Sequence, residues 1–251
     1  MPPQTIDEIL TELDQIILRA RNERDRLGFF AALYRNVTRN VKQGIAAGLF
    51  EDGPRMERLD VIFANRYLAA LGSFRRGEPV SKCWLTSFQI AATWPPIILQ
   101  HLLTGMNAHI NFDLGIAAQA AAPGAQLASL KNDFNKINEI LGGMINRVRS
   151  DVEEVSPWIK LLDRYASQTE DRLINFSLGK ARESAWLVAN LINSTPADRL
   201  ARRMSILDEG VAKLGSLIAS PKEWLISLGL YAIRIRESND VPHVIDVLSQ
   251  V

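Results

Sequence analysis

The chain has 251 residues, with 29 Lys and Arg against 28 Asp and Glu, and 47% of its residues are hydrophobic. Because a nucleic-acid footprint needs an excess of basic residues on one face, the balanced charge argues against nucleic acid as a partner. The single cysteine, Cys83, excludes an intramolecular disulfide and fits a reducing cytoplasm, where we expect the protein. We expect its side chain to be buried or half-buried filler.

Hydrophobic residues recur at helical intervals along almost the whole chain. In chain order, helices are expected within 1–28, at 29–45, at 54–74, after Ser81, from Pro96 to Ala122, and at 127–148, 173–192, 200–218 and 224–235. A tail, 237–251, contains Pro242 and His243, which we expect to be exposed. No long strand pattern, glycine-rich phosphate loop or repeat interrupts this order.

These patterns predict an all-α protein, a single compact domain over 1–251 with about nine or ten helices and a buried central helix. That central helix lies in the apolar run from Trp94 to Ala122. Several polar residues interrupt the run, so we expect no membrane span.

The central run also holds the side chains best suited to bind a metal or to take part in catalysis. Two of the three histidines, His101 and His109, lie there, and Asp113 follows His109 by four residues. At about 100° per residue, His109 and Asp113 are about 40° apart, and His101 is about 80° from His109. All three therefore belong to one face of an otherwise apolar helix.

Three interpretations of this face stay open. The side chains of His109 and Asp113 can reach one metal ion, or Asp113 can accept the second ring N–H of a histidine ligand. Alternatively, the pair forms a buried hydrogen bond that serves packing. Asp60 lies among apolar residues and is expected either to join the metal ligands or to pair with Arg66 or another cation.

Further polar residues are candidates for contacts with a substrate. They are Tyr34, Thr38, Asn65, Asn107, Asn111 and Asp133. A separate cluster, Arg182 with Glu183 and Trp186, is interpreted as an intrahelical ion pair beside a packed indole.

Long motifs resemble those of a bacterial family described only as a domain of unknown function. They are Phe30-Ala31-x-x-Tyr34-x-x-Val37-Thr38, Leu59-Asp60-Val61-x-Phe63-Ala64-Asn65-Arg66-Tyr67, Gln100-His101-Leu102-Leu103-x-Gly105-Met106-Asn107-Ala108-His109-Ile110-Asn111-x-Asp113-Leu114-Gly115 and Asp133-Phe134-x-x-Ile137-Asn138. The resemblance covers roughly residues 29–190 and implies no particular activity.

A second resemblance concerns the spacing of His109 and Asp113. It is similar to the H-x-x-x-D motif by which all-helical zinc-dependent phospholipases C and related single-strand nucleases hold metal. The resemblance also implies that Asp60 corresponds to a carboxylate that lies upstream of this motif in those enzymes. Those enzymes begin with tryptophan and use a histidine-rich trinuclear site, whereas this chain begins with methionine and has three histidines. The resemblance therefore implies one or two metal ions at most.

The sequence thus predicts a metal-dependent enzyme that hydrolyses an ester or phosphoester. His101, His109 and Asp113 are the expected catalytic residues and, with Asp60, the ligands of a divalent metal, zinc or iron. One alternative is a non-haem iron oxygenase, and another is a non-catalytic helical protein with a buried polar network or a pocket for a small apolar ligand. The expected partners are a small molecule, which can be apolar, and a second copy of the chain.

Overall fold

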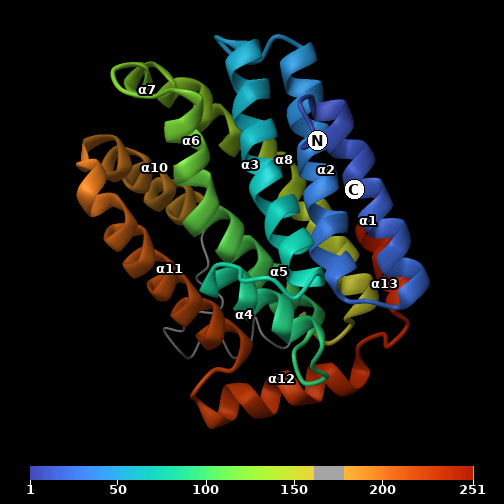
Figure 1. Ribbon diagram of the computed structural model, residues 1–251. Coiled ribbons are helices and arrows are strands. Elements are labelled where there is room, and N and C mark those ends of the chain that lie inside the picture. Colours follow the sequence, from blue (N-terminus) through green and yellow to red (C-terminus); the bar gives the residue numbers. More distant parts are fainter. Residues whose placement is uncertain (161–177, 251) are drawn as a thin grey trace.

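A computed structural model describes residues 1–160 and 178–250, and these residues form helices and connecting turns with no strand. The predicted all-α class is therefore confirmed (Figure 1). The helices are α1 (Ile6–Glu23), α2 (Leu27–Ala46), α3 (Gly53–Arg75), α4 (Lys82–Ala91), α5 (Ile98–Ala108), the π-helix η1 (His109–Leu114), α6 (Gly115–Ala121), α7 (Gln126–Ser129), α8 (Lys131–Val155), α10 (Leu178–Ser194), α11 (Ala197–Ala219), α12 (Trp224–Arg236) and α13 (Val241–Leu248). The first five residues of the helix expected at 173–192 lie outside the described residues.

Capping residues set where the early helices begin. The Thr5 side chain accepts a hydrogen bond from the backbone N–H of Glu8 at the start of α1. Asp52 does the same for Arg55 at the start of α3, where Pro54 occupies the first turn. These side chains satisfy backbone N–H groups that have no partner inside the helix.

The central run is continuous but not uniform, since α5, η1 and α6 follow one another without a break. Its residues pack against α2, α3, α4, α10 and α11, which confirms that the centre of the molecule is one buried helical run. The π-helical segment begins at His109 and contains Asp113. Such segments interrupt α-helices mostly as single turns and occur frequently at functional sites.

The C-terminal residues form part of the core. Pro242 lies in the first turn of α13, and Val244 and Ile245 are fully buried against α1, α2 and α8. His243 points to the other side and is exposed, as expected. The described residues of the segment expected as a tail, 237–250, are therefore mainly a packed helix.

At the foot of the molecule, α12 crosses beneath the other helices (Figure 1). A buried carboxylate, Glu237, joins it to its neighbours: it accepts a hydrogen bond from the Ile98 backbone N–H at 3.0 Å and from the Ser156 hydroxyl at 2.6 Å. The outer face of α12 exposes apolar side chains, among them Trp224, Leu228 and Tyr231.

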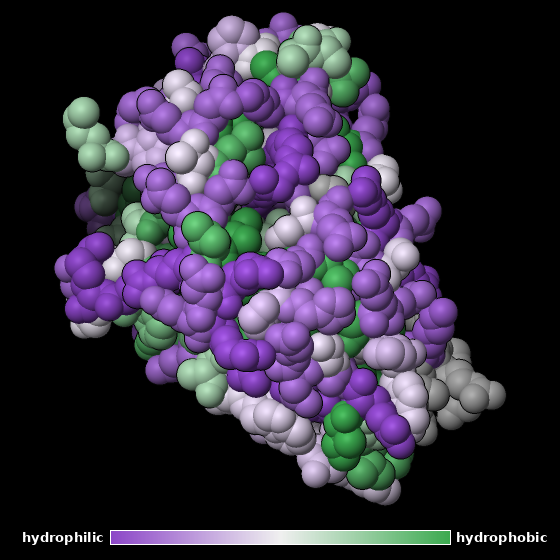
Figure 2. Space-filling view, turned by 90° about the vertical axis from the view of Figure 1, so that its right-hand side faces the viewer, coloured by the Kyte–Doolittle hydropathy of each residue, from purple (hydrophilic) through white to green (hydrophobic). Residues whose placement is uncertain are grey.

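Hydrophilic side chains cover most of the face shown in Figure 2, with hydrophobic ones in separate patches, one of them at the foot. Among the described residues, no helix combines the length and the apolar character needed to cross a membrane.

Candidate functional site

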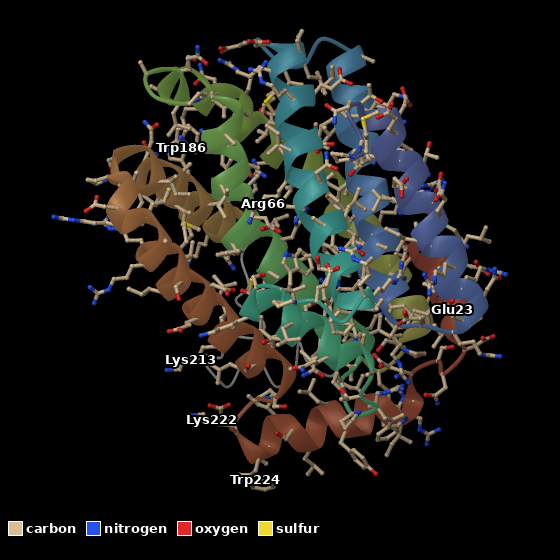
Figure 3. All side chains as sticks on the ribbon, viewed as in Figure 1. Glu23, Arg66, Trp186, Lys213, Lys222 and Trp224 are labelled. Carbon is tan, nitrogen blue, oxygen red and sulfur yellow. The ribbon has the colours of Figure 1, made fainter. Side chains whose placement is uncertain are left out.

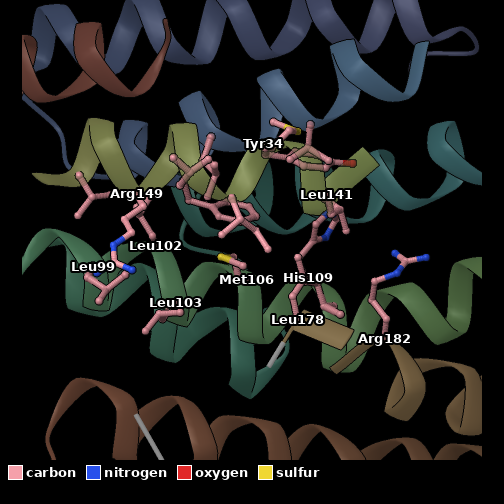
Figure 4. A pocket seen from close by; sticks show the side chains of 18 of the residues that line it. Tyr34, Leu99, Leu102, Leu103, Met106, His109, Leu141, Arg149, Leu178 and Arg182 are labelled. Carbon is pink, nitrogen blue, oxygen red and sulfur yellow. The ribbon is translucent and has the colours of Figure 1, made fainter. Parts of the chain in front are cut away.

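A cavity of about 640 Å³ lies between α2, α3, α5, η1, α8, α10 and α12. Apolar side chains make up most of its wall, including Leu102, Leu103, Met106, Leu141 and Leu230. Figure 4 shows it as an elongated space, with Leu99 and Arg149 at one end and His109 and Arg182 at the other. Protein interiors are normally close-packed, so a space of this size is unusual, and its volume lies in the range of small-molecule sites.

His109 forms part of the wall and lies between aromatic rings. Its ring stacks on Phe63 with centroids 3.5 Å apart, and Tyr34 meets it edge-on at 4.5 Å. Burial lowers the pKa of His109, although Asp113 opposes the effect, so the imidazole is neutral at pH 7. Neither ring nitrogen has a hydrogen bond of normal geometry among the described residues.

Asp113 lies behind His109, in a buried network. Its two carboxylate oxygens accept hydrogen bonds from Nε of Arg66 and Nε1 of Trp84, each at 2.7 Å. Nδ1 of His109 is 3.5 Å from the oxygen that Trp84 also contacts. In the view of Figure 3, Arg66 lies between the ribbons of α3 and α6, whereas Lys213 and Lys222 project outward at the edge. Asp113 therefore lies beside His109 and can hold its ring in place, but it does not line the cavity.

Three further buried polar groups, on α2 and α3, have no hydrogen bond of normal geometry among the described residues. They are the Tyr34 hydroxyl, the Thr38 hydroxyl and Oδ2 of Asp60. Asp60 and Tyr34 line the cavity. Burial, together with the charge of Glu57, raises the pKa of Asp60 to about 7, and burial raises that of Tyr34. Unpaired buried polar atoms are costly, so these groups are the polar atoms of the site that most need a partner.

His101 lies apart from this group, on another side of α5. Its ring meets Phe29 edge-on at 5.7 Å and is absent from the cavity wall. Burial, with the charges of Arg26 and Arg234, lowers its pKa to about 3. His101 is therefore a neutral core side chain.

The other expected substrate contacts hold backbone segments together. Asn65 donates to the carbonyl of Pro3, and Asn107 donates to that of Val211 while it accepts from Asn111. Asp133 accepts from the backbone N–H groups of Glu51 and Asp52 and from Arg55. None of these side chains lines the cavity, unlike Tyr34, Asp60 and His109.

The four expected metal ligands are thus not brought together. Within 1–160 and 178–250, no three His, Cys, Asp or Glu side chains gather closely enough to hold one ion. His109 and Asp60 share the cavity wall, while Asp113 is bonded to Arg66 and Trp84.

Arg182 is the cavity residue whose role the sequence interpretation missed. Its side chain is buried, whereas Glu183 is exposed, so the expected intrahelical ion pair does not form. Instead, Arg182 donates to the Phe134 carbonyl at 2.5 Å and lies 4.5 Å over the Phe134 ring. Its spacing from Leu178 and Ala185 places it on the apolar face of α10, a signal that was present in the sequence.

Fold and site together define an all-α protein with an elongated, largely apolar cavity that has polar side chains at both ends. By sequence, the chain belongs to a family of unknown function, DUF5995, whose model matches residues 6–221. No curated protein and no solved structure matches the chain. Function must therefore be argued from the cavity.

Proposed function

We propose that this protein binds an elongated, largely apolar small molecule in the cavity. The observation that carries the proposal is the cavity itself, about 640 Å³ with a mainly apolar wall. Sites for small molecules typically occupy about 300–1,000 Å³ and combine such walls with a few polar groups. An alkyl chain suits the part lined by Leu102, Leu103 and Met106.

The end of the cavity at His109 would receive a polar atom of the ligand. Tyr34 supplies a hydroxyl, Asp60 a carboxyl group with a pKa of about 7, and His109 a neutral ring. Each can donate or accept a hydrogen bond in its neutral form. A ligand hydroxyl or carbonyl oxygen there would satisfy groups that lack partners among the described residues.

A chain-length series tests this proposal. Each methylene group transferred from water into an apolar site contributes about 0.8 kcal/mol, or roughly fourfold in Kd. Titration calorimetry with linear alcohols of increasing length should therefore give stepwise tighter binding until the cavity is filled. Met106→Trp, which fills the middle of the cavity, should abolish binding while the protein stays folded.

Leu187→Trp is the matched control, because Leu187 lies on α10 and is 69% exposed. That variant should bind like the wild type. Absence of binding by the wild type, or equal binding by Met106→Trp, would contradict the proposal.

The metal-dependent hydrolase remains a prediction, as does the non-haem iron oxygenase. One observation favours a metal site: the neutral ring of His109 and the Asp60 carboxyl group line the same cavity. A neutral imidazole is the form that ligates metals. Metal analysis of aerobically and anaerobically purified protein would test it. Stoichiometric zinc or iron that is lost in His109→Ala would support it.

A further inference from the structure

Arg182 is a buried cation in the wall of the apolar cavity. Only 5% of the residue is exposed. Its Nη2 donates to one backbone carbonyl, that of Phe134, and its Nε has no partner among the described residues. An ionised group that is removed from water normally has an opposite charge beside it.

No carboxylate supplies that charge in the described part of the chain. Arg182 takes part in no ion pair there, and the neighbouring Glu183 is exposed. Burial alone lowers the pKa of Arg182, to about 9, with no acidic neighbour to raise it. At pH 7 the guanidinium is still charged, and none of the described residues around it supplies a counter-charge.

We propose that the cavity ligand carries a carboxylate head group, which Arg182 binds at the end that also holds His109. This inference rests on the proposed function, because the apolar wall would hold the chain of the same molecule. The planar guanidinium can donate two parallel hydrogen bonds to one carboxylate. A long-chain monocarboxylate combines both requirements.

The other arginine in the wall is less suited to this role. Arg149 lies at the opposite end of the cavity (Figure 4) and pairs with Glu153 at 3.1 Å. A carboxylate there would have to compete with Glu153. Arg182, which has no carboxylate partner among the described residues, instead lies at the same end as His109 (Figure 4).

Head groups can be compared on one alkyl chain by calorimetric titration at pH 7, with dodecanoate and dodecan-1-ol as the probes. Wild-type protein should bind dodecanoate at least tenfold more tightly than the alcohol, since a hydrogen bond to a charged group exceeds a neutral one by that order. Arg182→Met should lose this preference and still bind the alcohol. Arg182→Lys keeps the positive charge but lacks the planar guanidinium, so it should retain part of the preference for dodecanoate.

Arg58→Met is the matched control, because Arg58 also donates to a backbone carbonyl, that of Ala121, but lies outside the cavity wall. It should keep the full preference. Equal binding of both probes by the wild type would overturn the proposed carboxylate head group but would still support an apolar ligand site. A preference that survives in Arg182→Met would overturn the role of Arg182, and binding of neither probe would overturn the proposed function itself.

Discussion

At the residue scale, burial controls the charge state of the polar groups at the site. Asp60 is 7% exposed, and its carboxyl group has a pKa of about 7. An unfolded aspartic acid releases its proton near pH 4. Between about pH 4 and 7 the folded protein therefore holds a proton that the unfolded chain has lost.

It follows that the contribution of Asp60 to the free energy of unfolding falls as the pH rises through that window. The loss amounts to at most about 4 kcal/mol by pH 8. Asp60→Asn cannot ionise, so its stability relative to wild type should increase from pH 4.5 to pH 8 in urea unfolding experiments. Asp198→Asn, at a side chain that is 74% exposed, should follow the wild type. If the free energies of unfolding of Asp60→Asn and wild type change in parallel with pH, the raised pKa of Asp60 is refuted.

Asp113 illustrates the opposite case, a buried carboxylate with strong partners. Arg66→Met removes one of them and leaves the carboxylate, 1% exposed, with only part of its compensation. We expect the free energy of unfolding to fall by about 3 kcal/mol. Arg19→Met breaks an exposed pair with Glu23 and should cost less than about 0.5 kcal/mol. Similar losses in the two variants would show that the Arg66–Asp113 pair is not a structural requirement.

At the element scale, glycines set how closely helices approach the central run. A Cβ atom at Gly115 would lie 2.6 Å from the carbonyl oxygen of Ala185, in the backbone of α10. A backbone atom cannot yield as a flexible side chain can. The distance between α6 and α10, and with it the position of Arg182, therefore depends on the absence of a side chain at residue 115.

Gly115→Ala should consequently destabilise the protein by about 1–3 kcal/mol, measured by thermal or urea unfolding. Gly142 is exposed in α8 and has open space around its Cα, so Gly142→Ala should stabilise by about 0.5–1 kcal/mol. The prediction fails if both substitutions change stability in the same direction.

The sequence was sufficient to predict the helices, because their hydrophobic repeats and caps are local signals. Pro54 and Pro96 marked helix starts that the structure places within a few residues. The π-helical turn at His109 was not predictable, since it changes the backbone hydrogen bonds without changing the apolar pattern.

The site was only partly predictable for a similar reason. His109, Asp60 and Tyr34 do share one cavity, but helical spacing cannot tell which neighbours a polar side chain meets. Arg66 and Trp84, far apart in sequence, are the partners of Asp113, and His101 faces Phe29 instead of His109. The cavity itself depends on packing among seven helical segments and leaves no mark in the sequence.

At the scale of the whole molecule, the residues beyond the family match complete the fold. The match ends at residue 221, yet α12 contributes Leu225 and Leu230 to the cavity wall. Helix α13 fills the groove between α1, α2 and α8. Both the core and the site therefore need this C-terminal segment.

Adjacent residues in α13 allow a matched comparison of this role. Val244 is 0% exposed, so Val244→Asp would bury an unpaired charge and should cost on the order of 4 kcal/mol, with loss of soluble protein. His243→Asp, on the exposed side of the same turn, should change the free energy of unfolding by less than about 0.5 kcal/mol. A Val244→Asp variant with wild-type thermal stability would show that α13 is not part of the core.

The central claim, that the cavity holds the chain of an apolar ligand, is tested most directly by calorimetric titration of dodecanoate into wild-type protein and Met106→Trp. The wild type should saturate with one ligand per chain. Met106→Trp should fold, with a melting temperature at or above that of the wild type because the new ring fills the cavity, and should release no binding heat. The same isotherm for both proteins would contradict the account.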